Sequence, residues 1–526
     1  MKKIYYILAL VATTLAVSSC ADSYLDQYPG GSTITESQYL NMDNATEGTV
    51  KGVYPLLYAY GGDHDVFGQR SIDMYGDLLC GDMALKTQNY GWFSTDELEQ
   101  TYTRRAYFWN YYYSIIRICN KALNAIETKY PEEIANIAAV NVDDATDDFL
   151  TMLMYAAEIY TMRGWAYAGL SRYFIAPDED LNAQAIPIYT EEDTKGDTIL
   201  GAPRASVADV YLRIEEDFNT AIEIFEITDA IGIKRSNKIE TNADVARISL
   251  AYSYLNKGDY AKAFQAAEQA IQKTEAVLLT QDKVLTTGFN DISSNNWIWG
   301  KDVTVENTTA LASFFGQCDI YSYSYASAGD IKGIDQLLYE SIPAWDIRKF
   351  WWNNYANSGE KRASTFEYAP DGKFYSATSK KLQGDRDWLS DDVYMRLELA
   401  YLIAAEAACR QSDYTNAKNY LFAITDQRVS DGQETEYEEW KEALSDADLL
   451  ATIKYNWRVE LWGEGFGLQT LRRYGEKVNL GENHLRNNKE VDPSTARKFT
   501  FELPNSELYY NPYIRTTDVS NLKHKN

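Results

Sequence analysis

The fold class of this chain is decided by the stretch Tyr252-Ser253-Tyr254-Leu255-Asn256-Lys257-Gly258-Asp259-Tyr260-Ala261-Lys262-Ala263, which joins two runs of helical periodicity between Ala243 and Ile271. Gly258 suits the left-handed conformation that ends a helix, and Asp259 suits the cap of the next one. Small side chains then let two helices approach closely; they are Ala263, Ala266, Ala267 and Ala270. The stretch therefore predicts two helices packed on each other across a turn.

A weaker copy of this pattern lies in Tyr401–Thr425, with Ser412-Asp413-Tyr414 at the turn and Ala417 after it. Ser412 takes the place of the glycine. Both copies resemble the tetratricopeptide helix–turn–helix, but they lie much farther apart than the repeat of about 34 residues in a regular array. We therefore expect degenerate helical pairs in one curved scaffold, with a large insertion between them.

Helical periodicity also marks the rest of the scaffold. Its strongest runs lie at about 40–60, 105–127, 150–175, 204–273 and 392–475. The chain has only 11 prolines in 526 residues, which favours long helices over an all-β architecture, and no Pro- or Ser-rich linker divides it. The prediction is an all-α protein with a single domain over residues 20–526. Its tetratricopeptide-like scaffold covers about 36–274 and 391–480, and a loop-rich, aromatic-rich insertion covers about 275–390.

The N-terminus has the pattern of a secretion signal. Met1-Lys2-Lys3 is followed by the apolar run Ile4–Val17 and then by Ser18-Ser19-Cys20. This run is shorter than the roughly 20 apolar residues that span a membrane, and the residue that closes it is a cysteine. Val17–Cys20 resembles the bacterial lipobox. We therefore expect residues 1–19 to be a signal peptide and Cys20 to carry lipid, which anchors the protein to a membrane.

The charge of the chain excludes one class of partner. It has 77 acidic and 50 basic residues, a formal net charge of −27. Because nucleic-acid binding requires basic patches, no nucleic-acid partner is expected, whereas neutral sugars and proteins remain suitable. The cysteines after Cys20 form no C-x-x-C and fit buried small side chains better than a disulfide framework or a zinc site; they are Cys80, Cys119, Cys318 and Cys409. No metal or other cofactor is predicted.

Aromatic residues are unusually frequent, at 14% of the chain with 42 Tyr, 12 Trp and 18 Phe. This is more than a helical core needs, so we expect some of these side chains to be displayed. They gather in the insertion and in a loop from His64 to Phe93. Trp297 and Trp299 are two residues apart, so in an extended segment they share one face, next to Asn296. Two indole planes beside an amide suit successive sugar rings, which offer C–H faces and hydroxyl edges.

Several stretches, taken in order, resemble the SusD/RagB family of nutrient-binding lipoproteins. They are Tyr24–Pro29 after the lipobox cysteine, Phe108–Asn120, Ala157–Tyr173, Ile186–Tyr189, Pro203–Val207, Arg396–Ala407, Arg458–Gly475 and Leu503–Pro512. Their order along nearly the whole mature chain carries the resemblance, since no single stretch is specific. Gly467 stands where the family usually has an arginine and Thr470 where it has an aspartate. This departure predicts that one buried ion pair of the family is absent.

The resemblance implies a non-catalytic, surface-exposed lipoprotein of the outer membrane. Such a protein binds an oligosaccharide and delivers it to a partner, a TonB-dependent (SusC-like) transporter. Family members contact glycans through loops of an N-terminal part and of the insertion. The ligand-binding residues expected on this basis are Asp82, Asn89, Tyr90, Trp92, Asn296, Trp297, Trp299 and Tyr323.

Two other functions are also compatible with the sequence. The first is an inverting glycoside hydrolase on a helical scaffold, with Asp77 and Asp82 as the carboxylate pair. The chain has only three histidines and no H-E-x-x-H, G-x-S-x-G or Walker A motif, so other hydrolytic chemistry has little support and no enzyme is predicted. The second is a tetratricopeptide-like adaptor that holds a protein partner in its concave groove.

Overall fold

The computed structural model describes residues 45–93, 104–137, 140, 142, 145–191, 193, 201–285, 289–321, 323–352, 366–370, 372–374, 389–485, 489–494 and 499–514. The chain divides into two compact units, Met1–Thr46 and Glu47–Asn526, and the architecture below is that of the second. Cys20 and the stretch Tyr24–Pro29 lie outside the described residues.

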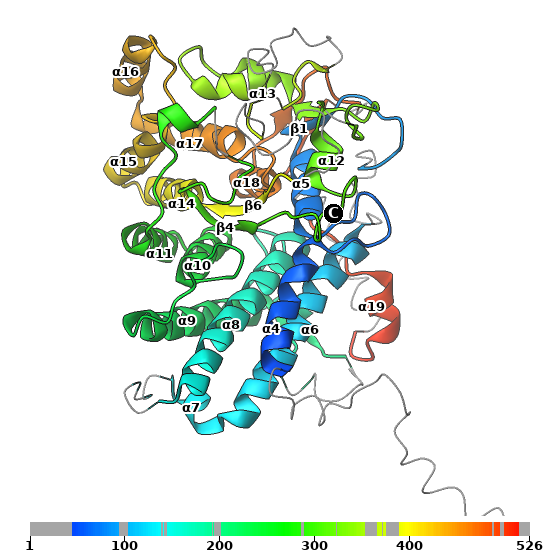
Figure 1. Cartoon of the computed structure of the whole chain (residues 1–526). Helices are drawn as coiled ribbons and strands as arrows, with labels where there is room; N and C mark the ends of the chain where they lie inside the picture. Colours follow the sequence, from blue (N-terminus) through cyan, green and yellow to red (C-terminus); the bar gives the residue numbers. More distant parts are fainter. Residues whose placement is uncertain are drawn as a thin grey trace, which may run out of the picture. The chain divides into compact units, whose positions relative to one another are not determined.

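Helices dominate the described residues (Figure 1). The α-helices are α4 (Ala45–Val53), α5 (Gln69–Cys80), α6 (Arg105–Lys129), α7 (Pro131–Ala135), α8 (Asp147–Phe174), α9 (Val207–Ala230), α10 (Ala243–Lys257), α11 (Tyr260–Lys273), α12 (Phe314–Cys318), α13 (Gln336–Glu340), α14 (Leu397–Arg410), α15 (Tyr414–Thr425), α16 (Glu434–Ala443), α17 (Asp446–Glu460), α18 (Gly467–Tyr474) and α19 (Asn505–Tyr510). Short 3₁₀ helices are η1 (Tyr54–Tyr58), η5 (Gln281–Lys283) and η6 (Ile347–Trp351). The predicted all-α class is confirmed.

The described strands are short and pair two by two, always antiparallel. The pairs are β1 (Met83–Leu85) with β5 (Lys332–Ile334), β2 (Gln184–Pro187) with β3 (Arg204–Ser206), β4 (Trp297–Lys301) with β6 (Asp392–Arg396), and β7 (Val478–Asn479) with β8 (Glu490–Val491). Each ladder ties together two segments of the helical scaffold or its insertion.

The two sequence copies of the helical pair form α10/α11 and α14/α15, with the same turn. Gly258 has φ +85°, its N–H donates to the Leu255 carbonyl, and the Asp259 N–H donates to the Tyr254 carbonyl. Ser412 also has a positive φ, +65°, and the same two bonds recur from Ser412 to Cys409 and from Asp413 to Ala408. These are the paired bonds that close a helix with a left-handed residue. The expected tetratricopeptide-like pairs are confirmed.

The insertion does not interrupt the stack of helices. α11 packs directly on α14, so α9, α10, α11, α14 and α15 follow one another in space (Figure 1). The chain leaves this stack after α11, and β4 pairs with β6 where the chain returns to it, with Trp297 opposite Arg396. The five residues of β4 are all buried. The β4–β6 pair therefore joins the two ends of the insertion, and the buried β4 packs on the scaffold.

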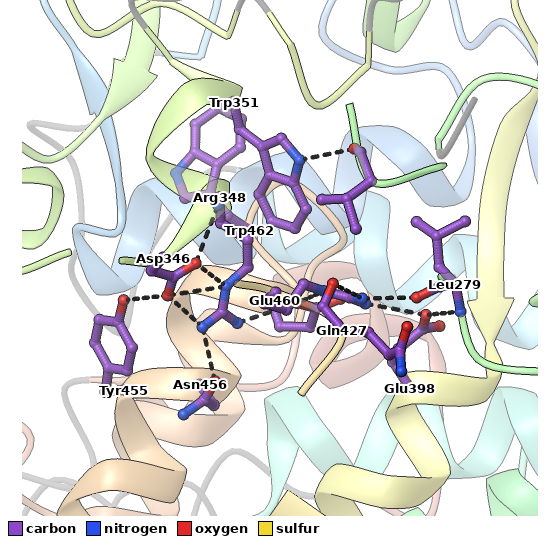
Figure 2. A network of polar contacts seen from close by, with 12 residues as sticks. Leu279, Asp346, Arg348, Trp351, Glu398, Gln427, Tyr455, Asn456, Glu460 and Trp462 are labelled. Atoms are coloured by element: carbon purple, nitrogen blue, oxygen red, sulfur yellow. Dashed lines mark hydrogen bonds and ion pairs between the residues drawn. The ribbon is translucent and has the colours of Figure 1, made fainter. Parts of the chain in front are cut away.

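A buried network of charges joins the insertion to the scaffold (Figure 2). Arg348 of η6 pairs with Asp346 at 2.6 Å and with Glu460 of α17 at 3.0 Å. Glu460 also pairs with Arg428 at 2.8 Å and with Arg396 of β6 at 2.7 Å, and all these side chains are 0% exposed. Burial alone raises the pKa of a carboxyl, but the guanidinium groups of the three arginines hold the pKa of Glu460 well below its usual range.

The network includes further contacts between the insertion and the scaffold. Arg396 also forms an ion pair with Glu464 at 2.8 Å, and Glu464 forms another with Lys373 of the insertion at 2.7 Å. Arg428 donates to the Leu279 carbonyl at 2.8 Å and pairs with Glu398 at 3.2 Å. Each of these buried charges is paired with an opposite charge. The ion pairs therefore hold the insertion on the scaffold although they have lost contact with water.

The turn geometry leads to a matched pair of substitutions. Gly258→Ser places a side chain at positive φ, where nothing lies within 4 Å of the new Cβ, so only backbone strain opposes it. Ser412→Gly relieves the same strain. We expect the first to lower and the second to raise the free energy of unfolding, each by about 1 kcal/mol. Urea denaturation of the two variants checks this, and a loss of stability in Ser412→Gly would contradict it.

The buried network leads to a second prediction. Arg348→Met leaves Asp346 buried without its guanidinium partner, so we expect a loss of about 3–5 kcal/mol in the free energy of unfolding. The control is Lys441→Met, which removes the partly exposed ion pair of Lys441 with Asp426 and is expected to cost about 0–1 kcal/mol. Equal denaturation midpoints for the two variants would show that the network contributes no more than a surface pair.

Candidate functional site

The ladder of β1 and β5 brings two distant loops together. Met83 lies opposite Ile334 and Leu85 opposite Lys332, and the Lys86 N–H extends the ladder to the Ile331 carbonyl at 2.8 Å. The loop that follows β1 and the segment that precedes β5 therefore leave the ladder side by side. Both are rich in aromatic residues.

Asp330 clamps these two loops to each other. It is fully buried, and its Oδ1 accepts hydrogen bonds from the backbone N–H groups of Asn89 and Tyr90. The Asn89 side-chain amide donates to the Ala328 carbonyl at 2.7 Å. Gly329, at φ +113°, makes this possible, because a Cβ there would lie 2.0 Å from Asn89 Nδ2. The backbone under Asn89 and Tyr90 is thus held in place before any ligand binds.

Above this clamp five rings form a cluster that we call the aromatic platform: Tyr60, His64, Tyr90, Trp92 and Tyr325. His64 stacks on Trp92, with ring centroids 5.5 Å apart and an interplanar angle of 19°. Tyr325 stands edge-on to Tyr90 at 5.2 Å and to Trp92 at 6.3 Å. The Tyr325 hydroxyl is 2.8 Å from His64 Nδ1, and Tyr60 meets His64 edge-on at 5.8 Å. The rings support one another in a fixed arrangement.

Part of the platform faces solvent. Tyr90 is 56% exposed and Tyr60 is 50% exposed, and Tyr323, two residues before Tyr325, is 53% exposed. Asn89 is exposed beside them. Burial raises the pKa of Tyr325, so its hydroxyl stays protonated at neutral pH. The surface thus offers aromatic faces together with hydroxyl and amide groups, the combination that receives the C–H face and the hydroxyl edge of a sugar.

Ion pairs and hydrogen bonds also hold the segment around His64. Arg104 bridges Asp63 at 2.8 Å and Asp65 at 2.7 Å, on either side of His64, and Asp65 accepts from the Tyr75 hydroxyl at 2.6 Å. The His64 carbonyl accepts from Gln317 Nε2 at 2.8 Å.

Gln317 in turn accepts from the ammonium of Lys332 at 3.1 Å, and Lys332 also donates to the Asp330 carbonyl at 3.2 Å. Burial lowers the pKa of Lys332. This lysine therefore ties the segment under His64 to the clamp residue Asp330.

Four of the predicted ligand residues meet at this surface: Asn89, Tyr90, Trp92 and Tyr323. Three further platform residues were not predicted. Tyr325 lies in the aromatic-rich insertion and His64 begins the loop His64–Phe93, so both carried a signal. Tyr60 preceded that loop and had no signal of its own.

The expectation that Trp297 and Trp299 are displayed is wrong. Both are 1% exposed, Trp299 Nε1 donates to the Ile239 carbonyl at 2.9 Å, and its ring meets Trp165 edge-on at 5.5 Å. The register of β4 shifts between the two tryptophans, and the strand is packed on both faces. Asn296 is also buried and donates to the carboxylate of Glu398. Spacing alone could not show that the scaffold covers this strand.

Asp82 does not reach the platform. It is 3% exposed, and its Oδ1 pairs with Arg458 at 2.7 Å. Asp77, its partner in the hydrolase alternative, is 1% exposed, and burial raises its pKa to about 7. Asp77 accepts from the backbone N–H groups of Gly465 and Gly467, each at 3.1 Å, at the start of α18. Asp77 thus holds the start of α18 and Asp82 is paired with α17, and both aspartates lie beneath the surface.

Gly467 explains the close approach of these acids. A Cβ at this position would lie 2.9 Å from Asp77 Oδ1 and 3.0 Å from Asp82 Oδ2. The glycine leaves room for the Asp77 carboxylate to accept from the Gly467 N–H directly. Thr470 bonds within its own helix, from Oγ1 to the Phe466 carbonyl at 2.9 Å.

Two features are absent from the described residues. None of the helices in that part of the chain is long and apolar enough to cross a membrane. No group of three or more His, Cys, Asp or Glu side chains that could hold a metal ion occurs there.

Two kinds of comparison relate the sequence to known proteins. A family model described as "Starch-binding associating with outer membrane" (SusD-like) matches residues 23–250, and the SusD family model matches residues 342–521. A SusD-like protein of Bacteroides ovatus is 24% identical over 224 residues, which cover 39% of this chain and 39% of that protein. The match therefore spans well under half of the curated relative.

Solved structures agree over a greater length. A SusD-like carbohydrate binding protein of Bacteroides vulgatus matches with a TM-score of 0.68 and 22% identity, covering 90% of this chain and 97% of that one. A SusD superfamily protein of Bacteroides thetaiotaomicron matches with a TM-score of 0.69 and 20% identity, covering 92% and 99%. At these identities the structures establish the fold, while the family models match most of the sequence. The chain belongs to the SusD/RagB family.

Proposed function

We propose that the protein binds oligosaccharides on the aromatic platform. The observation that carries the proposal is the fixed gathering of Tyr90, Trp92 and Tyr325 from two distant loops, with Tyr90 and Tyr323 more than half exposed. A pre-arranged aromatic surface loses little side-chain freedom when a sugar stacks on it. The description of the matching family model as starch-binding and the carbohydrate-binding relative from Bacteroides vulgatus support the same function.

The proposal also covers the cellular location of the protein and its partner. We infer that it is anchored at the outer membrane through lipid on Cys20 and delivers its ligand to a TonB-dependent, SusC-like transporter. The lipobox-like N-terminus and the outer-membrane wording of the family description support the anchor. The strongly acidic composition suits a neutral ligand and disfavours a phosphate-rich one. The proposal contains no catalytic step, since the carboxylate pair considered for hydrolysis is buried and bonded.

The platform is tested by a double substitution, Tyr90→Ala with Tyr323→Ala. Both rings are more than half exposed, so we expect an unchanged thermal midpoint and at least a tenfold loss of affinity at the platform. The probes are defined neutral hexasaccharides of the malto-, cello-, xylo- and manno- series, measured by calorimetry. Chromatography of the same mixtures after incubation reports any hydrolysis.

The matched control is Tyr509→Ala with Tyr510→Ala, which removes two tyrosines that are 76% and 85% exposed on α19. It should bind the hexasaccharides as the unmodified protein does. Unchanged binding in the Tyr90/Tyr323 variant, or shortened sugars after incubation, would overturn the proposed function.

The anchor has its own test. Cys20→Ala removes the only cysteine of the lipobox-like sequence, so we expect the protein to leave the membrane fraction of the cells that produce it. Fractionation followed by immunoblotting measures this. A variant retained at the level of the unmodified protein would contradict lipidation at Cys20.

A further inference from the structure

A groove of about 270 Å³ lies away from the platform, between α6 and α19. Trp109, Tyr113, Ser114 and Arg117 of α6 line one side of it, and Tyr189, which follows β2, and Glu507 of α19 complete it. It shares no residue with the platform. Binding at the platform and binding in this groove can therefore be separated by substitution.

The aromatic lining of the groove is rigid. Tyr113 lies 4.7 Å from Trp109 and meets Tyr189 edge-on at 5.6 Å, and its hydroxyl donates to the Pro187 carbonyl at 2.7 Å. The backbone of Tyr189 is held by Tyr167, whose hydroxyl accepts from the Tyr189 N–H at 2.9 Å. Burial raises the pKa of Tyr189 to about 12, so this phenol remains neutral.

Three polar groups in the lining are open to a ligand. Trp109 is 3% exposed as a whole, and it brings an indole N–H donor to the lining of the groove. Among the described residues, Arg117 has no ion pair, and Glu507 uses one carboxylate oxygen to accept from Asn511 at 2.6 Å. The groove thus carries two donors and one acceptor around an aromatic floor.

We propose that this groove is a second saccharide site, which holds one neutral pyranose ring. The C–H face of the ring lies against Tyr113 and Tyr189, while its oxygens accept from Trp109 and Arg117 and a hydroxyl donates to Glu507. An apolar side chain of a protein partner would leave all three polar groups without a bond, which is unfavourable once they are buried. The volume is just below the range of about 300–1,000 Å³ for drug-sized ligands, so it suits a single ring.

The test uses the full chain with the Tyr90→Ala/Tyr323→Ala platform variant as background. On that background at least one neutral hexasaccharide of the panel should still bind, as seen by saturation-transfer NMR and calorimetry. Adding Ser114→Trp places an indole in the groove and should weaken this remaining binding at least tenfold. Ser114 is exposed on α6, so the helix accepts the change.

Two further variants complete the experiment. Glu223→Trp adds the same bulk at an exposed position of α9, outside the groove, and should leave the remaining binding unchanged. Arg117→Met removes one donor from an exposed position and should weaken it about tenfold, which serves as the test if Ser114→Trp lowers the thermal midpoint.

The second site is refuted if the platform variant binds no hexasaccharide of the panel, or if Ser114→Trp and Arg117→Met both leave the remaining binding unchanged. If the platform variant binds the hexasaccharides as the unmodified protein does and Ser114→Trp removes this binding, the groove is the saccharide site. The proposed role of the platform is then wrong.

Discussion

The carboxylate of Glu460 is the point on which the architecture depends. Three arginines from different parts of the chain surround it: Arg348 from the insertion, Arg396 from the strand that closes the insertion, and Arg428 from the loop after α15. Each guanidinium is fully buried and has given up its water. Moving any one of these segments would leave a charge in the interior without a partner, which is far more costly than losing an apolar contact. The network therefore keeps the insertion in one position on the helical scaffold.

That constraint reaches the aromatic platform. β5 and the segment with Tyr325 belong to the insertion, whereas Tyr90 and Trp92 follow β1 near the N-terminal helices. The platform keeps its shape only if the insertion segment and the segment after β1 cannot move relative to each other. The buried network, the β1–β5 ladder and the Asp330 clamp provide that rigidity at three successive levels. The proposed sugar surface is thus a property of the joint between insertion and scaffold, and not of either loop alone.

The aromatic residues divide between two tasks. The largest fully buried side chains include six tryptophans, Trp297, Trp299, Trp351, Trp352, Trp457 and Trp462. The most exposed large rings are mainly tyrosines, among them Tyr90, Tyr323, Tyr509 and Tyr510. The hydroxyl of tyrosine lets the ring stand in water while it still offers an aromatic face. The high aromatic content therefore reflects both a large core and a displayed surface.

Local chemistry was enough to predict the helical pairs. Gly258 and Asp259 end one helix and start the next through backbone conformation and capping, which depend on neighbours in the chain, and the weaker copy at Ser412 keeps the same turn. The sequence also marked the loop with Asn89, Tyr90 and Trp92 and the segment with Tyr323 as displayed. It could not tell that Trp297 and Trp299 are covered, because their burial depends on β6 and Trp165, which are remote in the sequence. Nor could it pair Asp82 with Arg458 or place His64 on Trp92. Exposure and charge pairing arise from contacts between distant segments, so only the tertiary structure decided which residues form the core and which form the candidate site.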